Sequence, residues 1–195
     1  IKKKLLSLGL TAAMVACYTP ATIFADEVGN QGNVIEVSTY QELKEALGYN
    51  KYDAEKGAFV ATEGTAKEGD TIKLTADLIA ETDKANPKGN KRTGDSATDA
   101  RFDSTTGATV TVATNNVTID GNGHTIDGDG YPTFDFDGVK GAELKNITVE
   151  DGAYTAKIGG AIFIEYGAEV SMDNITVKDS SANATSAFNG GGAIY

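Results

Sequence analysis

Short runs in which hydrophobic and polar residues alternate fill most of the chain after residue 108, with glycine, asparagine and aspartate between them. Alternation with a period of two predicts β-strands, because successive side chains of a strand point to opposite faces of a sheet. No segment after Gly48 has helical periodicity. The pattern predicts strands at 109–112, 117–119, 124–126, 134–136, 144–149, 161–165, 170–172 and 175–177.

The residues before this region predict a different kind of structure. A helix is expected to begin at a cap formed by Ser38 or Thr39 and to end at Gly48, with Glu42 three residues after Thr39 as in a capping box. Its hydrophobic residues lie on one face, and a polar stretch without predicted structure follows it. One strand is expected before the helix, at 34–37, and another after the polar stretch, at 70–75.

Two short words recur along the chain at similar intervals. Asn followed by a branched aliphatic residue, Thr and a second branched aliphatic residue occupies 116–119, 146–149 and 174–177, and Gly-Gly-Ala-Ile-aromatic occupies 159–163 and 191–195. Such periodicity is typical of repeat proteins, in which each unit buries its hydrophobic face against the next unit. Two or three short strands in each repeat fit one coil of a parallel β-helix.

The alignment of the Asn words predicts which side chains stack in that β-helix. The first aliphatic residue of each word should point inward as one stack, and the second as another, while the Thr between them points outward. The expected inward stacks are Val117 with Ile147 and Ile175, and Ile119 with Val149 and Val177, with Thr118, Thr148 and Thr176 outside.

The asparagine of each word has two interpretations. Asn116, Asn146 and Asn174 could form a ladder of side-chain hydrogen bonds at a tight corner. Each is also an Asn-x-Thr glycosylation sequence, as is the one that begins at Asn183. Stacking is the more economical interpretation, because three of the four sequences occupy one repeat position, and glycosylation requires a eukaryotic host.

The first 25 residues predict an export signal. Three lysines precede an apolar run from Leu5 to Cys17, and cleavage is expected after Ala25, which leaves Asp26 as the new N-terminus. An alternative is lipidation of Cys17, the single cysteine. The second Gly-Gly-Ala-Ile word coincides with the end of the sequence. We therefore expect the chain to be an N-terminal fragment of a longer protein, with its array of repeats truncated at the C-terminus.

The charge of the chain constrains its partners. The net charge is −11, and removal of the signal takes away three lysines and no acidic residue, which leaves −14. This balance argues against nucleic acid and against an anionic membrane as partner, because both need clustered basic residues. We therefore expect membrane contact only through an anchor outside this sequence.

Residues 80–107 contain the main group of basic residues among polar ones, with few large hydrophobic side chains. This composition predicts a long loop. The basic residues could be a contact site, although a solvated loop is the more common explanation. The organisation expected is a signal at 1–25, a leader and N-terminal cap at 26–79, the polar loop at 80–107 and β-helix coils at 108–195.

Acidic residues supply the candidates for chemistry. The acidic candidates are Asp120, Asp127, Asp129, Asp135 and Asp137, and the first three of them are weak candidates for Ca²⁺ binding. All but Asp135 are followed by glycine, and an Asp-Gly pair is also a common turn. The single histidine, His124, lies in a predicted strand after a glycine turn, which favours a structural or surface role. We assign no catalytic residue, no cofactor-binding residue and no cofactor.

The words at 146–149 and 174–177, the block Asp-Gly-Asn-Gly-His-Thr-Ile-Asp-Gly at 120–128 and the Gly-Gly-Ala-Ile words together resemble those of bacterial right-handed β-helix surface proteins. These belong to the pectin-lyase-like superfamily, and the resemblance is strongest to adhesin-like autotransporter passengers with polymorphic-outer-membrane-protein repeats. The Phe-x-x-Asn half of that repeat is missing, since Phe188 is followed directly by Asn189.

The resemblance implies an all-β, right-handed parallel β-helix (a solenoid) with a short N-terminal cap that contains one helix. It also implies a protein secreted to the cell surface, at a bacterial outer membrane or cell wall. There it would be a non-catalytic adhesin-like binding or spacer module, whose partner is a host-cell or matrix ligand with a glycan among the candidates. The alternatives are a polysaccharide lyase or glycoside hydrolase and a purely structural stalk.

Overall fold

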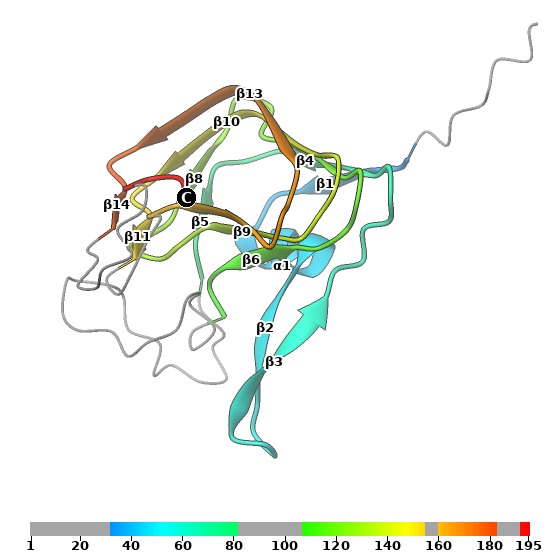
Figure 1. Ribbon diagram of the computed structural model, residues 1–195, viewed down its shortest axis with the longest axis vertical. Coiled ribbons are helices and arrows are strands. Elements are labelled where there is room, and N and C mark those ends of the chain that lie inside the picture. The colour runs from blue at the N-terminus through cyan, green and yellow to red at the C-terminus, as the bar shows by residue number, and fades with distance from the viewer. Residues whose placement is uncertain (1–31, 82–106, 155–159, 183–191) are drawn as a thin grey trace, which may run out of the picture.

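The computed structural model describes residues 32–81, 107–154, 160–182 and 192–195 (Figure 1). The expected signal, most of the expected loop at 80–107 and Asn183 lie outside these residues. The described part is an all-β fold with parallel sheets and one helix. In chain order the elements are β1 (Val34–Val37), α1 (Tyr40–Leu47), β2 (Gly48–Asp53), β3 (Ala58–Glu63), β4 (Thr71–Leu74), β5 (Leu78–Ile79), β6 (Val110–Val112), β7 (Thr118–Asp120), β8 (Thr125–Asp127), β9 (Phe134–Asp137), β10 (Ala142–Glu150), β11 (Ala153–Tyr154), β12 (Ile162–Glu165), β13 (Val170–Lys178) and β14 (Ser181–Ala182).

The helix α1 begins and ends where the sequence predicts. The Thr39 hydroxyl accepts a hydrogen bond from the Glu42 backbone amide at 3.2 Å, and the Glu42 carboxylate accepts one from the Thr39 amide at 3.0 Å. Thr39 is therefore the cap, and the capping box is confirmed. Hydrogen bonds from Ser38 and Thr39 hold the pKa of Glu42 below its usual value. Gly48 ends the helix at φ 124°, where a side chain would be strained.

The polar stretch after the helix is not without structure, which corrects the sequence-based prediction. β2 and β3 form an antiparallel hairpin with six residue pairs, and Figure 1 shows it projecting from the rest of the molecule. The rings of Tyr52 and Phe59 face each other edge to face, with 5.3 Å between their centroids. Polar residues hide this hairpin in the sequence, because most residues of the two strands are only partly buried or exposed and hydrophobic alternation is therefore weak.

The larger sheet of the described part is parallel. It contains seven strands, in the order β1-β4-β7-β10-β8-β5, with β13 on the free side of β10. The long strand β10 pairs with β7 through its first half, with β8 through its second half and with β13 along its length. The predicted strands at 170–172 and 175–177 are therefore one strand, β13. They join because Asn174 bends the chain at φ 51° without breaking the pairing.

A second sheet has the order β12-β9-β6-β2-β3, and only its β2 contacts are antiparallel. β11 and β14 form a third, two-stranded parallel sheet. The helix lies against the start of β6, where the Tyr40 hydroxyl donates to the Ala108 carbonyl oxygen at 2.6 Å. The buried Lys44 ammonium donates to the Gly107 carbonyl oxygen at 3.2 Å. These contacts fasten the helix over one end of the sheets.

The predicted stacks are right for two of the three Asn words and wrong for the first. Ile147 pairs with Ile175 and Val149 with Val177, and all four pack in the core or against it. Ile119, however, pairs with Leu144, while Val149 pairs with Ile126 on its other side. Val117 and Thr118 are displaced with Ile119, so Thr118 lies beside Glu143 rather than Thr148.

The displacement has a physical cause in the block at 120–128. Residues 121–124 stand opposite only two residues of β10, so two additional residues are accommodated between β7 and β8. Gly121 permits this because a side chain there would come within 2.4 Å of the Ile147 Cβ. The first Asn word consequently aligns with residues 141–144, although its sequence matches residues 146–149.

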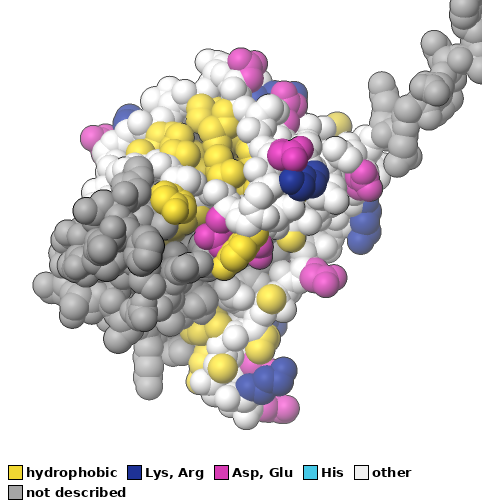
Figure 2. Space-filling model, viewed as in Figure 1, with side chains coloured by type: hydrophobic (Ala, Val, Ile, Leu, Met, Phe, Trp, Pro, Cys, Tyr) yellow, Lys and Arg dark blue, Asp and Glu magenta, His cyan; other side chains and the backbone are white. Residues whose placement is uncertain are grey.

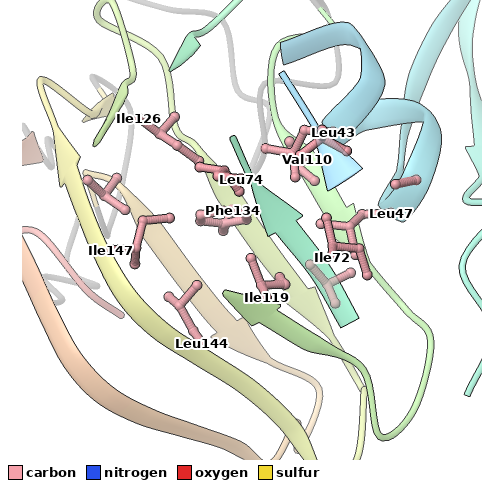
Figure 3. Close-up of a cluster of buried hydrophobic side chains, with 14 of the residues drawn as sticks. Leu43, Leu47, Ile72, Leu74, Val110, Ile119, Ile126, Phe134, Leu144 and Ile147 are labelled. Carbon is pink, nitrogen blue, oxygen red and sulfur yellow. The ribbon is translucent and has the colours of Figure 1, made fainter. Parts of the chain in front are cut away.

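Hydrophobic side chains from the helix and from successive strands form one core (Figure 3). Its largest members are fully buried, and they include Phe134, Phe136, Ile119, Ile126 and Leu144. Each lies at an alternating position of its strand, as the period-two pattern requires. The polar neighbours of these residues therefore point away from the core, and on β9 they form part of the candidate site.

Candidate functional site: an acidic cleft beside the hairpin

A cleft of about 500 Å³ is lined by the hairpin, by the segment that follows it and by residues of β6 and β9 in the second sheet. The hairpin approaches closely at Gly48, where an added Cβ would lie 3.0 Å from the Thr111 carbonyl oxygen and 3.1 Å from that of Thr62. β2 meets β6 through a single pair, Tyr49 with Val110. Because the two strands share only this one ladder pair, they are not joined along their length.

Asp135 lines this cleft from β9. Phe134 and Phe136 on either side of it are fully buried in the core, so alternation turns the Asp135 side chain to the opposite face. Its strand neighbours there are Thr111 of β6 and Phe163 of β12. Figure 2 shows acidic side chains gathered over β9, beside hydrophobic ones.

The Asp135 carboxyl is buried without full hydrogen bonding. The residue is 5% exposed, and its Oδ1 atom has no hydrogen-bond partner among the described residues. Burial, together with the nearby charges of Glu165 and Asp137, raises the pKa of Asp135 to about 8. At neutral pH this side chain is therefore a neutral acid that can donate a proton or a hydrogen bond, and it ionises when a cation approaches.

The three calcium candidates serve as turn residues. Asp120 Oδ1 accepts hydrogen bonds from the Asn122 amide at 2.8 Å and the Asn146 side chain at 3.2 Å. Asp127 Oδ1 accepts one from the Asp129 amide at 2.7 Å, and Asp129 has φ 44°. Within the described ranges, no group of three or more His, Cys, Asp or Glu side chains is arranged to hold a metal ion.

His124 connects the start of β8 to the segment between β4 and β5. Its Nδ1 atom lies 3.1 Å from Asp77 Oδ1, and the same oxygen accepts a hydrogen bond from the Thr125 amide at 2.9 Å. The Thr125 amide and then His124 hold the pKa of Asp77 below its usual value. The histidine thus has a structural contact and is not among the residues that line the cleft.

The asparagine ladder forms between two of the three words. Asn174 donates from its side chain to the Asn146 side-chain oxygen at 3.0 Å, and both have φ 51°. Asn116 stands apart beside Gly141, and its side chain donates to Glu68. Asn183 and the basic residues of the expected loop lie outside the described residues, so the structure does not address them.

The sequence marks Asp135 as one of five acidic candidates and does not predict the cleft. The signal available was the alternation Phe-Asp-Phe-Asp, which places a carboxyl on the outer face of a strand whose inner face is aromatic. What could not be found from sequence was the hairpin that walls the cleft. No helix of the described part is long and apolar enough to cross a membrane.

Comparison with known proteins gives a match to a family model, and none to a curated protein or a solved structure. A family model described as a "putative pectate lyase-like adhesive domain" matches residues 66–189, which include every strand from β4 to β14. The hairpin precedes the matched residues. Because the match covers more than half of the 195 residues, the chain belongs to the family of pectate lyase-like adhesive domains.

Proposed function

We propose that this protein is an exported, cell-surface adhesin-like module that binds a host-cell or matrix ligand and has no catalytic activity. The observation that carries the proposal is the family match, because the matched family is described as adhesive. The −11 charge adds that nucleic acid is not the ligand. Display at a bacterial outer membrane or cell wall and the role of an autotransporter-like passenger are part of the same proposal.

The finer architecture proposed is a right-handed parallel β-helix. Successive coils visit the three sheets in one order, from β10 to β11 to β12 and then from β13 to β14. In each of the three sheets one pair of strands joins residues 28 positions apart, as for Ala142 with Val170, Ala153 with Ser181 and Phe134 with Ile162. Crossovers between parallel strands are right-handed in about 98% of cases. Under this proposal residues 26–79 form the leader and cap, and 108–195 form the coils.

Adhesion is tested by attachment of the protein to cells and to matrix. Beads coated with the whole chain should attach, and beads coated with the Ile147→Asp variant should not, because that variant disrupts the sheets that carry the surface. A chain with 84–101 deleted tests the expected loop in the same assay. Equal attachment of uncoated beads and coated ones would contradict the adhesive function.

Export is tested by intact-mass analysis of secreted material. The expected mass corresponds to residues 26–195, because the apolar run of the signal is short and a cleavage point follows it. A mass that includes a lipidated Cys17 would contradict this processing.

The alternative function is that of a polysaccharide lyase or glycoside hydrolase, and one observation favours it. A carboxyl whose pKa lies near 8, as for Asp135, is suited to general acid catalysis at neutral pH. We expect no cleavage of polygalacturonate with or without Ca²⁺, since the net negative charge repels a polyanion. Release of unsaturated sugars that Asp135→Asn abolishes, or that changes of Asp127 or Asp129 to Asn abolish, would establish the enzyme instead.

A further inference from the structure

The cleft beside the hairpin has a ligand-binding character that turn residues do not explain. Asp135 is more than nine-tenths buried, lines the cleft and leaves one carboxyl oxygen without a partner in the described part. A buried polar atom without a hydrogen bond costs free energy of folding. We take the unpaired Asp135 oxygen to indicate that a bound ligand supplies the missing hydrogen bond. The wall opposite Asp135 is the hairpin, which precedes the residues matched by the family model. The cleft is thus formed in part by residues that the family match does not cover.

The charged groups around Asp135 are mostly acidic. Asp137 on the same strand and Glu165 on β12 both act on its carboxyl electrostatically. The other walls contribute Glu63 from β3 and Glu68 from the segment before β4. Lys67 is the cationic residue among those that line the cleft, and it is exposed. The hairpin also contributes Tyr49, whose ring lies 4.8 Å from the buried Lys44 ammonium.

This arrangement selects for an organic cation over a metal ion. The described residues offer no group of three carboxylate, imidazole or thiolate ligands. A guanidinium is more weakly hydrated than an ammonium and presents five donors in a rigid fork, so it enters a partly buried carboxyl site more readily. The cleft volume of about 500 Å³ is also far larger than a single ion needs, and it falls within the range of pockets that hold ligands of drug size.

We propose that this cleft binds the guanidinium group of an arginine side chain on a partner polypeptide, with the Asp135 carboxylate as its direct partner. The proposal rests on the adhesive function proposed above and names the chemistry of its ligand. Binding pairs the cation with the ionised carboxylate, so below about pH 8 the Asp135 proton is released to solvent as the arginine enters. The apparent affinity therefore rises with pH by up to about tenfold per unit and becomes constant above about pH 8.

Isothermal titration calorimetry of the whole chain tests this inference. The probes are acetyl-Gly-Arg-Gly-amide, the same peptide with neutral citrulline in place of arginine, and guanidinium chloride. We expect the arginine peptide to bind at pH 8.5 and about 25-fold more weakly at pH 6.5, with release of close to one proton per peptide at the lower pH. The citrulline peptide should not bind. Guanidinium chloride should bind more weakly than the peptide, because the cleft also accommodates the flanking chain.

Two variants locate the site. Asp135→Asn should abolish binding of the arginine peptide at both pH values, and its fold is checked by thermal unfolding at pH 6.5, where it has the charge of the protonated wild-type residue. Asp173→Asn is the same substitution at an exposed position of β13 and should bind as wild type does. Equal binding of the citrulline peptide, wild-type binding by Asp135→Asn, or no binding at pH 8.5 would each overturn the inference.

The attachment assay separates failure of this inference from failure of the adhesive function. Attachment that an excess of the arginine peptide does not reduce would overturn the inference and leave adhesion standing. Peptide binding without attachment to cells or matrix would overturn adhesion and leave the arginine site standing.

Discussion

The neighbouring strands β10 and β13 have nearly the same sequence pattern and differ in how they are covered. Ile147 is 3% exposed and Val149 is fully buried, whereas their register partners Ile175 and Val177 are only partly buried. β10 has strands on both sides, while in the described part β13 pairs with β10 alone. Figure 2 shows hydrophobic side chains gathered beside β13 on the face toward the viewer.

The comparison shows that an identical word contributes differently to stability according to its neighbours. Full burial of an Ile or Val side chain stabilises the fold by about 1.5–3 kcal/mol, and partial burial contributes correspondingly less. The opposite end of the sheets differs again, because α1 lies over it and its side chains Tyr40, Leu43 and Leu47 are buried. Matched substitutions in these regions measure the difference.

The largest expected effect is that of Ile147→Asp. It places a charge without a partner in the core, and the free energy of unfolding should fall by about 4 kcal/mol or more. Ile175→Asp at the register partner should cost about 1–2 kcal/mol, since water reaches that side chain. Urea unfolding followed by circular dichroism gives both values. Equal losses would show that β13 is covered as fully as β10.

Glycine substitutions in the two Gly-Gly-Ala-Ile words should differ next. A Cβ on Gly160 would lie 2.5 Å from the carbonyl oxygens of Gly192 and Ser181, which are backbone atoms that cannot move aside alone. Gly160→Ala should therefore destabilise the fold by about 1–3 kcal/mol. Gly192→Ala, at the same place in the second word, meets nothing within 4 Å and should have little effect. Thermal unfolding of the two variants is the measurement. A lower melting temperature for Gly160→Ala alone would show that glycine is needed where another segment packs against it, and equal losses would show that the word itself needs glycine.

The helix end of the molecule is tested by Thr39→Ala. This change removes the hydroxyl that caps α1 and should lower the free energy of unfolding by about 1 kcal/mol. Thr176→Ala, on the exposed face of β13, is the matched control and should be near neutral. If the two variants have the same free energy of unfolding, the capping box does not stabilise the protein.

The smallest expected difference concerns the asparagine ladder. Glycine keeps the positive φ available, so Asn146→Gly and Asn174→Gly remove only the side-chain hydrogen bonds. Asn146 makes two such bonds, to Asp120 and Asn174, and its loss should cost about 1 kcal/mol. Asn174 makes one exposed bond and should cost about half as much. A larger decrease in the free energy of unfolding for Asn174→Gly than for Asn146→Gly would contradict this order, in which the asparagine of β10 contributes more than that of β13.

Much of the local structure could be predicted from the residues alone. The capping box needs only Thr39 and Glu42 at the right spacing, and Gly48 ends the helix whatever surrounds it. The pairing of Ile147 with Ile175 follows from alternation and a 28-residue repeat, since a slip of one residue would expose both. The turn role of Asp127 is likewise local, because its carboxylate bonds the amide two residues later.

The rest depends on contacts between residues far apart in the sequence. The first Asn word has the same local sequence as the others, yet the two residues accommodated near Gly121 move Ile119 from Val149 to Leu144. The hairpin and the cleft it walls arise because Gly48 lets β2 approach Thr111. Asp135 is one acidic residue among several until the sheet and its neighbours bury it, and only then do the loss of water and the nearby charges of Glu165 and Asp137 raise its pKa to about 8. The local sequence pattern therefore determined which face of each strand is hydrophobic. Packing decided register, burial and charge, because desolvation of a side chain depends on residues that are close in space and distant in sequence.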